Sequence, residues 1–256
     1  MTGVTFPRVA ASEWTKLHSL WSSRISMLVA LGLVVGLGVF IPWLSVIEWD
    51  PNTTKENYDA VSRSIGGIYL AQLAFGVLGT MAVTGEYATG TIRATLAAVP
   101  TRLPVLWAKF VVFVAVTLIL GTLACVLAFV VGQAIFATKG VDASFGDLHV
   151  TRAVLGAGLF LSAMGAFGLA LGALLRNTAA AITTLTLVLF VVPVIVDILP
   201  WAESIGPYLP GMAGLAITST SPEGLTVGPW EGFGLLCLYV VVTMGAAAVM
   251  LIKRDA

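Results

Sequence analysis

Few side chains in this sequence are of the kinds that catalyse reactions or hold metal ions. The two histidines, His18 and His149, stand far apart, and Cys125 and Cys237 each lie alone inside an apolar run. They form no two-histidine metal motif, Ser-His-Asp pattern or redox pair, and the motifs HExxH and GxSxG are absent. The sequence therefore predicts no catalytic residue and no metal, and a hydrolase, protease or lipid-modifying enzyme has no constellation behind it.

The sequence also lacks GxxxxGK[ST], the loop that cradles nucleotide phosphates, so we do not expect the chain to hydrolyse a nucleotide by itself. Asp197 is the one acidic residue close behind an apolar run, which makes it a functional candidate by default. Because it lies just before Pro200, we interpret it as a wetted interfacial carboxylate. The apolar runs otherwise hold no series of carboxylates or histidines, which argues against a proton-coupled secondary transporter.

The richest polar interval is residues 85–109, GEYATGTIRATLAAVPTRLPVLWAK, which separates two long apolar runs. Its apolar residues recur at helical spacing, whereas its arginines fall off that stripe. The stripe consists of Ile92, Leu96, Val99, Leu103 and Leu106. We expect a short amphipathic helix over residues 88–100, with Thr89 at its N-cap and Pro100 at its end. Periodicity leaves two interpretations equally open: a lever that moves both neighbouring spans, or a helix resting on lipid headgroups.

The elements that must position this interval follow from the composition. Of the 256 residues, 58% are hydrophobic and only 10% are charged, whereas soluble domains carry about 25% charged residues. The net charge is zero, which argues against a nucleic-acid partner. We therefore predict an all-α membrane protein that forms one domain over residues 1–256. Its six expected spans are residues 25–47, 65–84, 105–136, 153–175, 179–199 and 230–252.

Basic and aromatic residues orient the predicted spans. With the N-terminus inside, nine basic residues fall in inner segments and four in outer ones, as the positive-inside rule requires. Both termini are then cytoplasmic. Residues 8–23 carry Trp14 and Trp21 on one helical stripe, with Glu13 and Lys16 off it. This pattern favours an N-terminal amphipathic helix in the membrane interface, with its tryptophans at headgroup depth and Lys16 snorkelling.

Residues 200–229 are rich in Pro and Gly, too apolar for a solvated loop and too broken for a span. We expect short helices here that dip into the outer leaflet, where protein or water must satisfy the backbone. One interpretation makes the segment an outer gate, and an interfacial loop resting on the bundle fits equally well. The gate residues would be Trp201, Tyr208, Leu209 and Met212.

Small residues recur at helix-packing spacing in two of the spans. Gly32 and Gly36 form a GxxxG pattern, and Gly165, Gly168 and Gly172 continue a small-residue face in the fourth span. Such residues let helices approach closely. We therefore interpret them as packing sites and not as substrate sites.

The run from residue 85 to residue 109 resembles the cytoplasmic loop of ABC-2-type transporter permeases, particularly a branch of actinobacterial character. The matching positions are Gly85, Glu86, Tyr87, Gly90, Thr91, Ile92, Arg93, Thr95, Leu96, Val99, Pro100, Ala108 and Lys109. The layout is similar over the whole chain: an amphipathic N-terminal helix, six spans and a broken apolar segment before the last span. The resemblance implies the fold of a type V exporter-like permease, in which this loop carries a coupling helix that docks on a separate ATPase.

The resemblance further implies the function and the partners. The chain would be the permease subunit of an exporter in the bacterial plasma membrane, moving a drug, antibiotic or lipid. It would pair with a second permease subunit, identical or related, and with two copies of the ATPase, which would hold ATP and Mg; this chain itself would bind no cofactor. The coupling interface would comprise Glu13, Lys16, Glu86, Thr89, Gly90, Thr91, Ile92, Arg93 and Leu96.

Two other functions remain open at this stage. The first is a non-transporting membrane scaffold or signalling subunit that uses the same kind of ATPase, and the second is an ion-coupled secondary transporter that needs no ATPase. Membrane lipid is an expected partner in every case. The apolar spans favour an amphipathic or lipophilic cargo over a sugar or a metal ion, but no motif identifies it.

Overall fold

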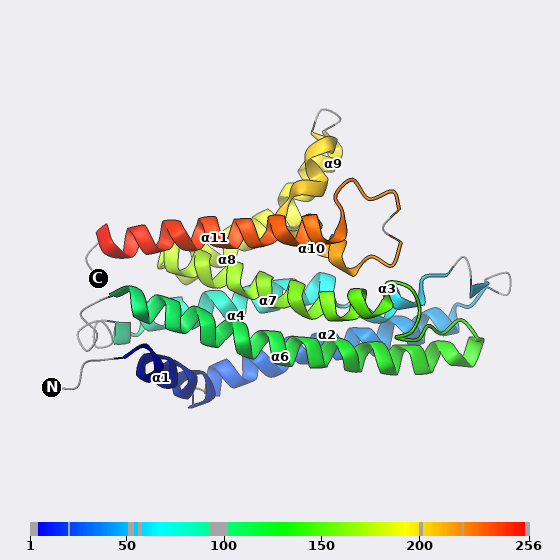
Figure 1. Ribbon diagram of the computed structural model, residues 1–256, viewed down its shortest axis with the longest axis horizontal. Helices are drawn as coiled ribbons and strands as arrows, with labels where there is room; N and C mark the ends of the chain where they lie inside the picture. Colours follow the sequence, from blue (N-terminus) through cyan, green and yellow to red (C-terminus); the bar gives the residue numbers. More distant parts are fainter. Residues whose placement is uncertain are drawn as a thin grey trace.

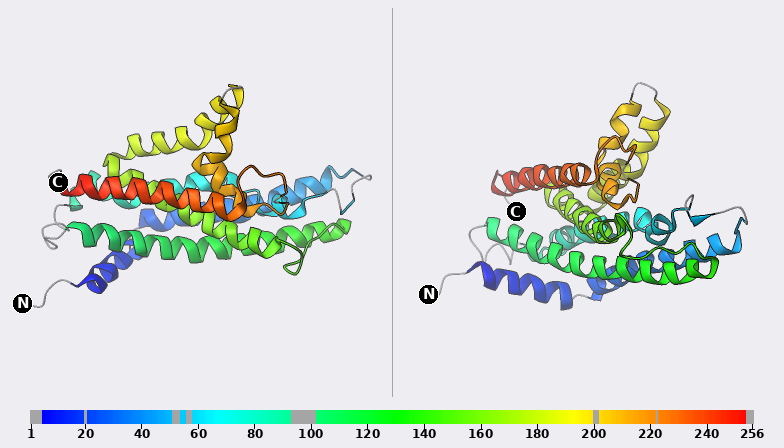
Figure 2. Two further views of the ribbon diagram at one scale, coloured as in Figure 1. Left: turned by 45° about the horizontal axis from the view of Figure 1, so that its top comes forward. Right: turned by 45° about the vertical axis from the view of Figure 1, so that its right-hand side comes forward.

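The computed structural model describes residues 5–19, 21–50, 54–55, 58–92, 102–199, 202–221 and 223–253. This part of the chain folds into helices joined by short connections, and no strand occurs in it (Figure 1). The predicted all-α fold is therefore confirmed. Helix α1 (Phe6–Ser19) and the end of α11 (Pro229–Lys253) lie together at one end of the bundle (Figure 2).

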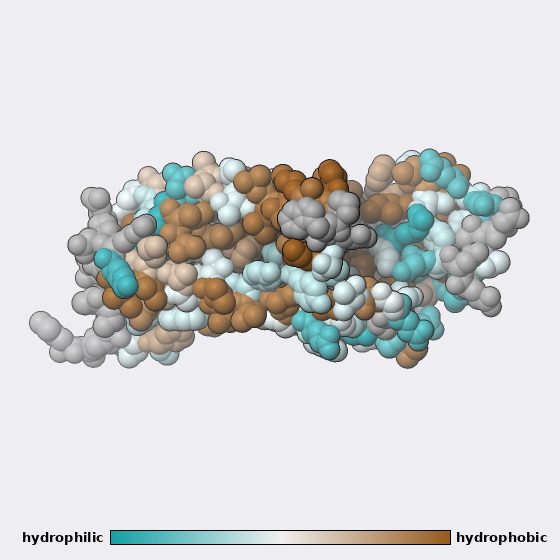
Figure 3. Space-filling model, turned by 90° about the horizontal axis from the view of Figure 1, so that it is seen from above, coloured by the Kyte–Doolittle hydropathy of each residue, from teal (hydrophilic) through white to brown (hydrophobic). Residues whose placement is uncertain are grey.

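Within the described residues, six helical segments are long and apolar enough to cross a membrane. They are Arg24–Ile47, Ala60–Ala88, Leu103–Lys139, Val150–Leu175, Thr178–Ile198 and Pro229–Lys253. Each overlaps one predicted span, so the prediction of a six-span membrane protein is confirmed. Viewed from above in Figure 3, the middle of the molecule carries mostly hydrophobic surface, and hydrophilic surface gathers toward its right-hand end.

The helices that build these spans have the following bounds. They are α2 (Trp21–Ile47), α3 (Ala60–Ile65), α4 (Ile68–Ala88), α6 (Arg102–Phe136) with η2 (Ala137–Lys139), α7 (Val150–Leu175) and α8 (Thr178–Thr186). The second span is longer than predicted because α3 precedes α4 with only two residues between them. Asp59 caps α3 by accepting a hydrogen bond from the Ser62 backbone N–H at 2.9 Å, and Asn177 caps α8 in the same way.

Helix α7 forms the axis of the bundle. It packs against α4, α6, α8 and α11. Of its most hydrophobic window, 83% of the residues are buried, compared with 22% in the span of α2 and 28% in that of α11. An apolar helix that is covered on every side is a core helix, and the outer spans present their apolar faces to lipid.

Glycines bring α4 and α7 into close contact. A Cβ atom on Gly79 would lie 1.9 Å from the carbonyl oxygen of Gly165, and one on Gly168 would lie 1.9 Å from the carbonyl oxygen of Gly76. Neither position therefore accepts a larger residue without moving a helix. Thr80 Oγ1 donates to the Gly168 carbonyl at 3.0 Å, which adds a hydrogen bond at the crossing.

The two glycine patterns predicted from the sequence have different outcomes. Gly165, Gly168 and Gly172 all lie against backbone or side chains of neighbouring helices, so the predicted packing face on α7 is confirmed. Cβ atoms on Gly32 and Gly36 would meet nothing within 4 Å. These two glycines therefore make no close helix contact within the described chain, because α2 turns their face away from the bundle, and their packing role stays a prediction.

The fifth span bends away from the bundle near its middle. After α8 the chain forms a π-helix, η3 (Leu187–Val191), and then α9 (Val192–Ile198), which leaves the bundle in every view (Figures 1 and 2). Pro193 lies at the start of α9 and lacks the N–H that would continue the helix ladder. Asp197 is exposed on α9.

The chain returns to the bundle through three short helices, as predicted for residues 200–229. They are η4 (Glu203–Tyr208), α10 (Pro210–Leu215) and η5 (Ala216–Thr218). Tyr239 of α11 donates its hydroxyl to the Tyr208 carbonyl at 3.2 Å, and α10 packs against α11. Trp201, one of the four predicted gate residues, lies outside the described residues.

Candidate functional site

Four charged side chains from three helices meet at the end of the bundle where α1 and the end of α11 lie. Lys16 Nζ of α1 lies 2.6 Å from Glu13 Oε1 and 3.0 Å from Glu86 Oε1 of α4. Lys109 Nζ of α6 lies 2.8 Å from Glu86 Oε1 and also donates to Glu13 Oε2. Each carboxylate thus accepts from both ammonium groups. We call Glu13, Lys16, Glu86 and Lys109 the charge cluster.

The charge cluster is largely withdrawn from solvent. The exposed fractions of its side chains are 3% for Glu13, 9% for Lys109, 12% for Glu86 and 30% for Lys16. Two positive and two negative groups leave the cluster neutral, which is the condition under which buried charges are tolerated. The loss of any one member leaves a buried charge without full compensation.

Three helices, α1, α4 and α6, bring the four charged groups together. Glu13 and Lys16 are three residues apart and share one face of α1. Glu86 lies in the last turn of α4, and Lys109 lies two turns into α6. Beside the charges, Val9 of α1 packs against Val105 and Ala108 of α6 in a small apolar cluster. Helix α1 is therefore held to α6 by apolar contact and to both α4 and α6 by charge.

The structure corrects the predicted length of the N-terminal helix and the predicted role of Lys16. Glu13 and Trp14 face different sides of α1, as the sequence pattern predicts, since Glu13 is only 2% exposed and Trp14 is 56% exposed. The helix turns its polar residue inward because Lys109 supplies the compensating charge. Lys16 likewise pairs with the cluster instead of snorkelling, and the helix ends at Ser19, with Trp21 already in α2.

Lys16 stays protonated at physiological pH. Burial alone lowers the pKa of its ammonium group, but the hydrogen bonds and negative charges of Glu13 and Glu86 outweigh burial and raise the pKa above its ordinary 10.5. The charge that closes the cluster is therefore constant across the physiological range.

A second set of contacts joins Tyr87, the residue of α4 that follows Glu86, to Arg176 and through it to α11. The Arg176 guanidinium lies 5.4 Å from the centre of the Tyr87 ring, within the range of a cation–π interaction. Arg176 also donates to the Met250 carbonyl near the end of α11 at 3.1 Å, where a cation complements the helix dipole. Adjacent residues of α4 thus contact α1 and α6 on one side and the α7–α8 turn and α11 on the other.

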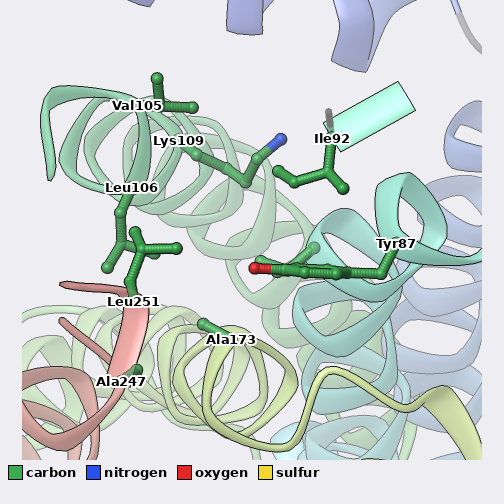
Figure 4. A pocket seen from close by; sticks show the side chains of 9 residues that line it. Tyr87, Ile92, Val105, Leu106, Lys109, Ala173, Ala247 and Leu251 are labelled. Atoms are coloured by element: carbon green, nitrogen blue, oxygen red, sulfur yellow. The ribbon is translucent and has the colours of Figure 1, made fainter. Parts of the chain in front are cut away.

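A cavity of about 380 Å³, including its open mouth, lies between these two sets of contacts. Its lining residues are Val83, Tyr87, Ile92, Val105, Leu106, Lys109, Ala173, Ala247 and Leu251. In Figure 4 the Tyr87 ring extends across the cavity and the Lys109 side chain points toward Ile92. The walls come from α4, α6, α7 and α11 and are mostly apolar.

The chain breaks from α4 at Gly90, two residues after the end of the helix and two before Ile92, which lines the cavity. Gly90 has a φ of 74°, a left-handed conformation that glycine adopts without strain. Thr89 Oγ1 donates to the Gly85 carbonyl at 2.9 Å, so its side chain closes α4 and does not cap the helix that follows. Thr91 and Ile92 already have helical backbone. Arg93 and Leu96, two predicted coupling residues, lie outside the described residues.

The structure brings some of the predicted site residues together and redirects others. Glu13, Lys16 and Glu86 meet in the charge cluster, with Thr89, Gly90 and Thr91 beside it. Within this chain Glu86 pairs with Lys16 and Lys109, and Ile92 is 8% exposed and lines the cavity; the contacts predicted for Glu86 and Ile92 with a partner stay predictions. The predicted gate residues Tyr208, Leu209 and Met212 belong to the other end of the bundle.

Sequence reasoning missed two residues of this site. Lys109 matched the permease motif but received no role, and Arg176 was not singled out. The available signal for each was a lone basic residue at the inner end of an apolar run, where a buried cation implies an acidic or aromatic partner. Among the described residues, no group of three or more His, Cys, Asp or Glu is placed to hold a metal ion.

A comparison with known families matches a long part of the chain, which includes part of the site. A family model, DUF2705, described as a protein of unknown function, matches residues 41–255. The chain belongs to the DUF2705 family. The DUF2705 match contains Glu86, Lys109 and Arg176, whereas Glu13 and Lys16 precede it. No curated protein matches the chain.

Proposed function

We propose that the chain is the membrane permease subunit of an ABC exporter whose ATPase is a separate protein. One observation carries this proposal: the charge cluster fastens α1, α4 and α6 together directly beside the break at Gly90. That break begins the segment at which the resemblance to ABC-2 permeases places the coupling helix. A surface that receives force must be fixed to the helices it moves, and the charge cluster supplies that attachment.

The proposed mechanism follows from the contacts at the inner end. An ATPase that presses on residues 88–100 would displace the end of α4, and Glu86 would carry α1 and α6 with it through Lys16 and Lys109. At the same time Tyr87 would act on Arg176 and so on the α7–α8 turn and α11. The glycine crossing between α4 and α7 would transmit the tilt because the two backbones are in direct contact there and Thr80 hydrogen-bonds across it, so α4 cannot move toward α7 without displacing it.

Other members of the complex supply what this chain lacks. The partner ATPase would bind ATP and Mg, and a second permease subunit, identical or related, would complete the pathway. An amphipathic or lipophilic cargo fits the apolar spans. At the outer end, Tyr208, Leu209 and Met212 belong to the segment proposed as the gate, and the side chains of Tyr208 and Met212 are 47% and 45% exposed.

The experiment that tests this function is reconstitution of the chain with its ATPase in proteoliposomes. Glu86→Gln removes a charge from the cluster and keeps the size of the side chain. We expect it to uncouple the complex, so that ATP hydrolysis continues while cargo movement per ATP falls several-fold. Glu48→Gln is the matched control, because Glu48 is an exposed acid at the other end of the bundle.

Two results would overturn the proposal. Transport by the chain alone under an ion gradient would make it a secondary transporter. Binding and stimulation of the ATPase without movement of any cargo would make it a signalling or scaffold subunit. Apart from these two results, equal cargo movement per ATP in Glu86→Gln and in the Glu48→Gln control would contradict the role of the charge cluster.

A further inference from the structure

A buried amide at the outer end of α4 has an unused hydrogen-bond acceptor. Gln72 is 1% exposed and lies in the first turn of α4. Its Nε2 donates to the Tyr69 carbonyl at 2.8 Å. Its Oε1 is buried and has no hydrogen-bond partner among the described residues. A buried carbonyl oxygen without a partner raises the free energy of the conformation that contains it.

The amide oxygen lies beside Gly211 of α10. A Cβ atom on Gly211 would lie 3.3 Å from Gln72 Oε1 and 3.3 Å from Leu189 Cδ2 of η3. Leu189 itself is 2% exposed. Glycine therefore lets the α10 backbone approach the oxygen closely, and a side chain of the π-helix, a feature frequent at functional sites, lies against the same glycine.

A second buried glutamine offers a contrast with Gln72, although Gln72 Oε1 is one of five buried side-chain atoms without a partner among the described residues. Gln133 of α6 is 7% exposed. Its Nε2 donates to the Ala60 carbonyl at 3.1 Å and to Ser64 Oγ at 3.0 Å. Its Oε1 accepts from the Ala143 backbone N–H at 2.8 Å. The amide nitrogen and the amide oxygen of Gln133 both form hydrogen bonds inside the fold, whereas the amide oxygen of Gln72 forms none among the described residues.

Helix α10 is a short element that packs against α11, α7 and η3 and meets α4 only loosely. It has six residues and is flanked by two short 3₁₀-helices, η4 and η5. On the side of α11 it is closely packed, since a Cβ atom on Gly232 would lie 2.2 Å from the Ala213 carbonyl oxygen. On the side of α4, Gly211 meets Gln72 without any hydrogen bond to Oε1.

We propose that α10 is a lid over Gln72, and that lifting the lid lets Gln72 Oε1 accept a hydrogen bond from a hydroxyl or N–H group. The donor is either water or a polar group on an otherwise apolar cargo. The seated lid leaves the acceptor unpartnered, and the lifted lid satisfies it, so Gln72 biases α10 toward opening. This inference rests on the proposed function only for the direction of cargo movement, because the lid and its acceptor need no ATPase.

The test compares Gln72→Leu with Gln133→Leu, which changes the same residue type at a satisfied site. Leucine at position 72 removes the unpartnered oxygen, so we expect a higher unfolding temperature in detergent. Leucine at position 133 removes three hydrogen bonds, so we expect a lower one. A lower unfolding temperature for Gln72→Leu, similar to that of Gln133→Leu, would overturn the proposal.

Opening of the lid is measured separately, without ATPase or cargo. In a chain with Cys125 and Cys237 replaced by alanine, Leu189→Cys reports opening through its rate of reaction with a water-soluble thiol reagent. We expect Gln72→Leu to slow this reaction by about fivefold or more, and an unchanged rate would refute the lid. Hydrogen–deuterium exchange of residues 209–218 provides the same comparison without an introduced cysteine.

A pair of probes distinguishes the two donors. If cargo supplies the hydrogen bond, 1-decanol will speed the reaction of Leu189→Cys more than decyl methyl ether does, and Gln72→Leu will abolish the difference. If water supplies it, the two probes will act alike while Gln72→Leu still slows opening. Because none of these measurements uses the ATPase, failure of the lid leaves the proposed function standing, and failure of the proposed function leaves the lid standing.

Discussion

The charge cluster makes Lys109 the most informative position to change. We predict that Lys109→Met destabilises the folded chain strongly and releases α1 from the bundle. Methionine keeps the apolar stem of the side chain, so the substitution removes the charge with little change in packing. Glu13, with a side chain only 3% exposed, is then left with Lys16 as its single cation in the cluster.

The size of the effect follows from the burial of the groups left behind. Removal of one partner from a buried ion pair costs about 3–5 kcal/mol, because the remaining charge is not compensated. Lys109 has two carboxylate partners, Glu13 and Glu86, which places the expected loss toward the upper part of that range. Glu13→Gln combined with Lys109→Met removes one charge of each sign, so we expect it to recover about 2 kcal/mol or more relative to additive single changes.

Equilibrium unfolding in mixed detergent micelles, followed by tryptophan fluorescence, measures these differences. Lys253→Met is the matched control, because Lys253 is an exposed lysine at the end of α11 and its loss is expected to cost less than about 0.5 kcal/mol. If Lys109→Met costs no more than Lys253→Met, or if the double variant is simply additive, then the cluster does not hold α1 and the reasoning fails.

Three further predictions follow from other contacts. Gly168→Val should abolish folding, because its Cβ would lie 1.9 Å from the Gly76 carbonyl oxygen, whereas Gly32→Val should express and unfold like the parent chain; similar yields of both proteins would contradict the α4–α7 crossing. Arg176→Ala should increase hydrogen exchange at the end of α11, because the Met250 carbonyl loses its donor; unchanged exchange would contradict this contact. The pKa of Lys16 is raised above 10.5 by its carboxylate partners, so the stability it contributes is fully present below pH 10.5 and is lost as pH rises through the folded-state pKa; a loss of stability between pH 6 and 9 in the parent chain that is absent in Lys16→Met would contradict it.

The spans were predictable because a long apolar run satisfies its own backbone hydrogen bonds in a bilayer by forming a helix. Ile25 to Ile47 and the five other runs needed no partner to become helices. The glycines of α7 were also readable, since small residues at helical spacing mark close approach. The same spacing at Gly32 and Gly36 does not mark a helix contact within the described chain, because periodicity does not say which face of α2 meets the bundle.

The site was harder to predict because its members come from distant parts of the chain. Glu86 and Lys109 flank one polar interval, but nothing local shows that Glu13 lies between them. A helical stripe drawn on α1 alone separates Glu13 from the tryptophans, and only the tertiary contact with Lys109 shows that Glu13 is buried. Gln72 gave no signal at all, since a lone glutamine in an apolar run becomes informative only when its partners are known.

Purification of the chain in mild detergent, followed by native mass spectrometry of what accompanies it, tests the central claim most directly. The proposed function predicts a complex of two permease subunits with two copies of a protein that carries GxxxxGK[ST]. It also predicts that Arg93→Glu, but not Glu48→Arg, removes that protein from the complex. A chain that purifies without any such protein and moves cargo on its own under an ion gradient would contradict the account.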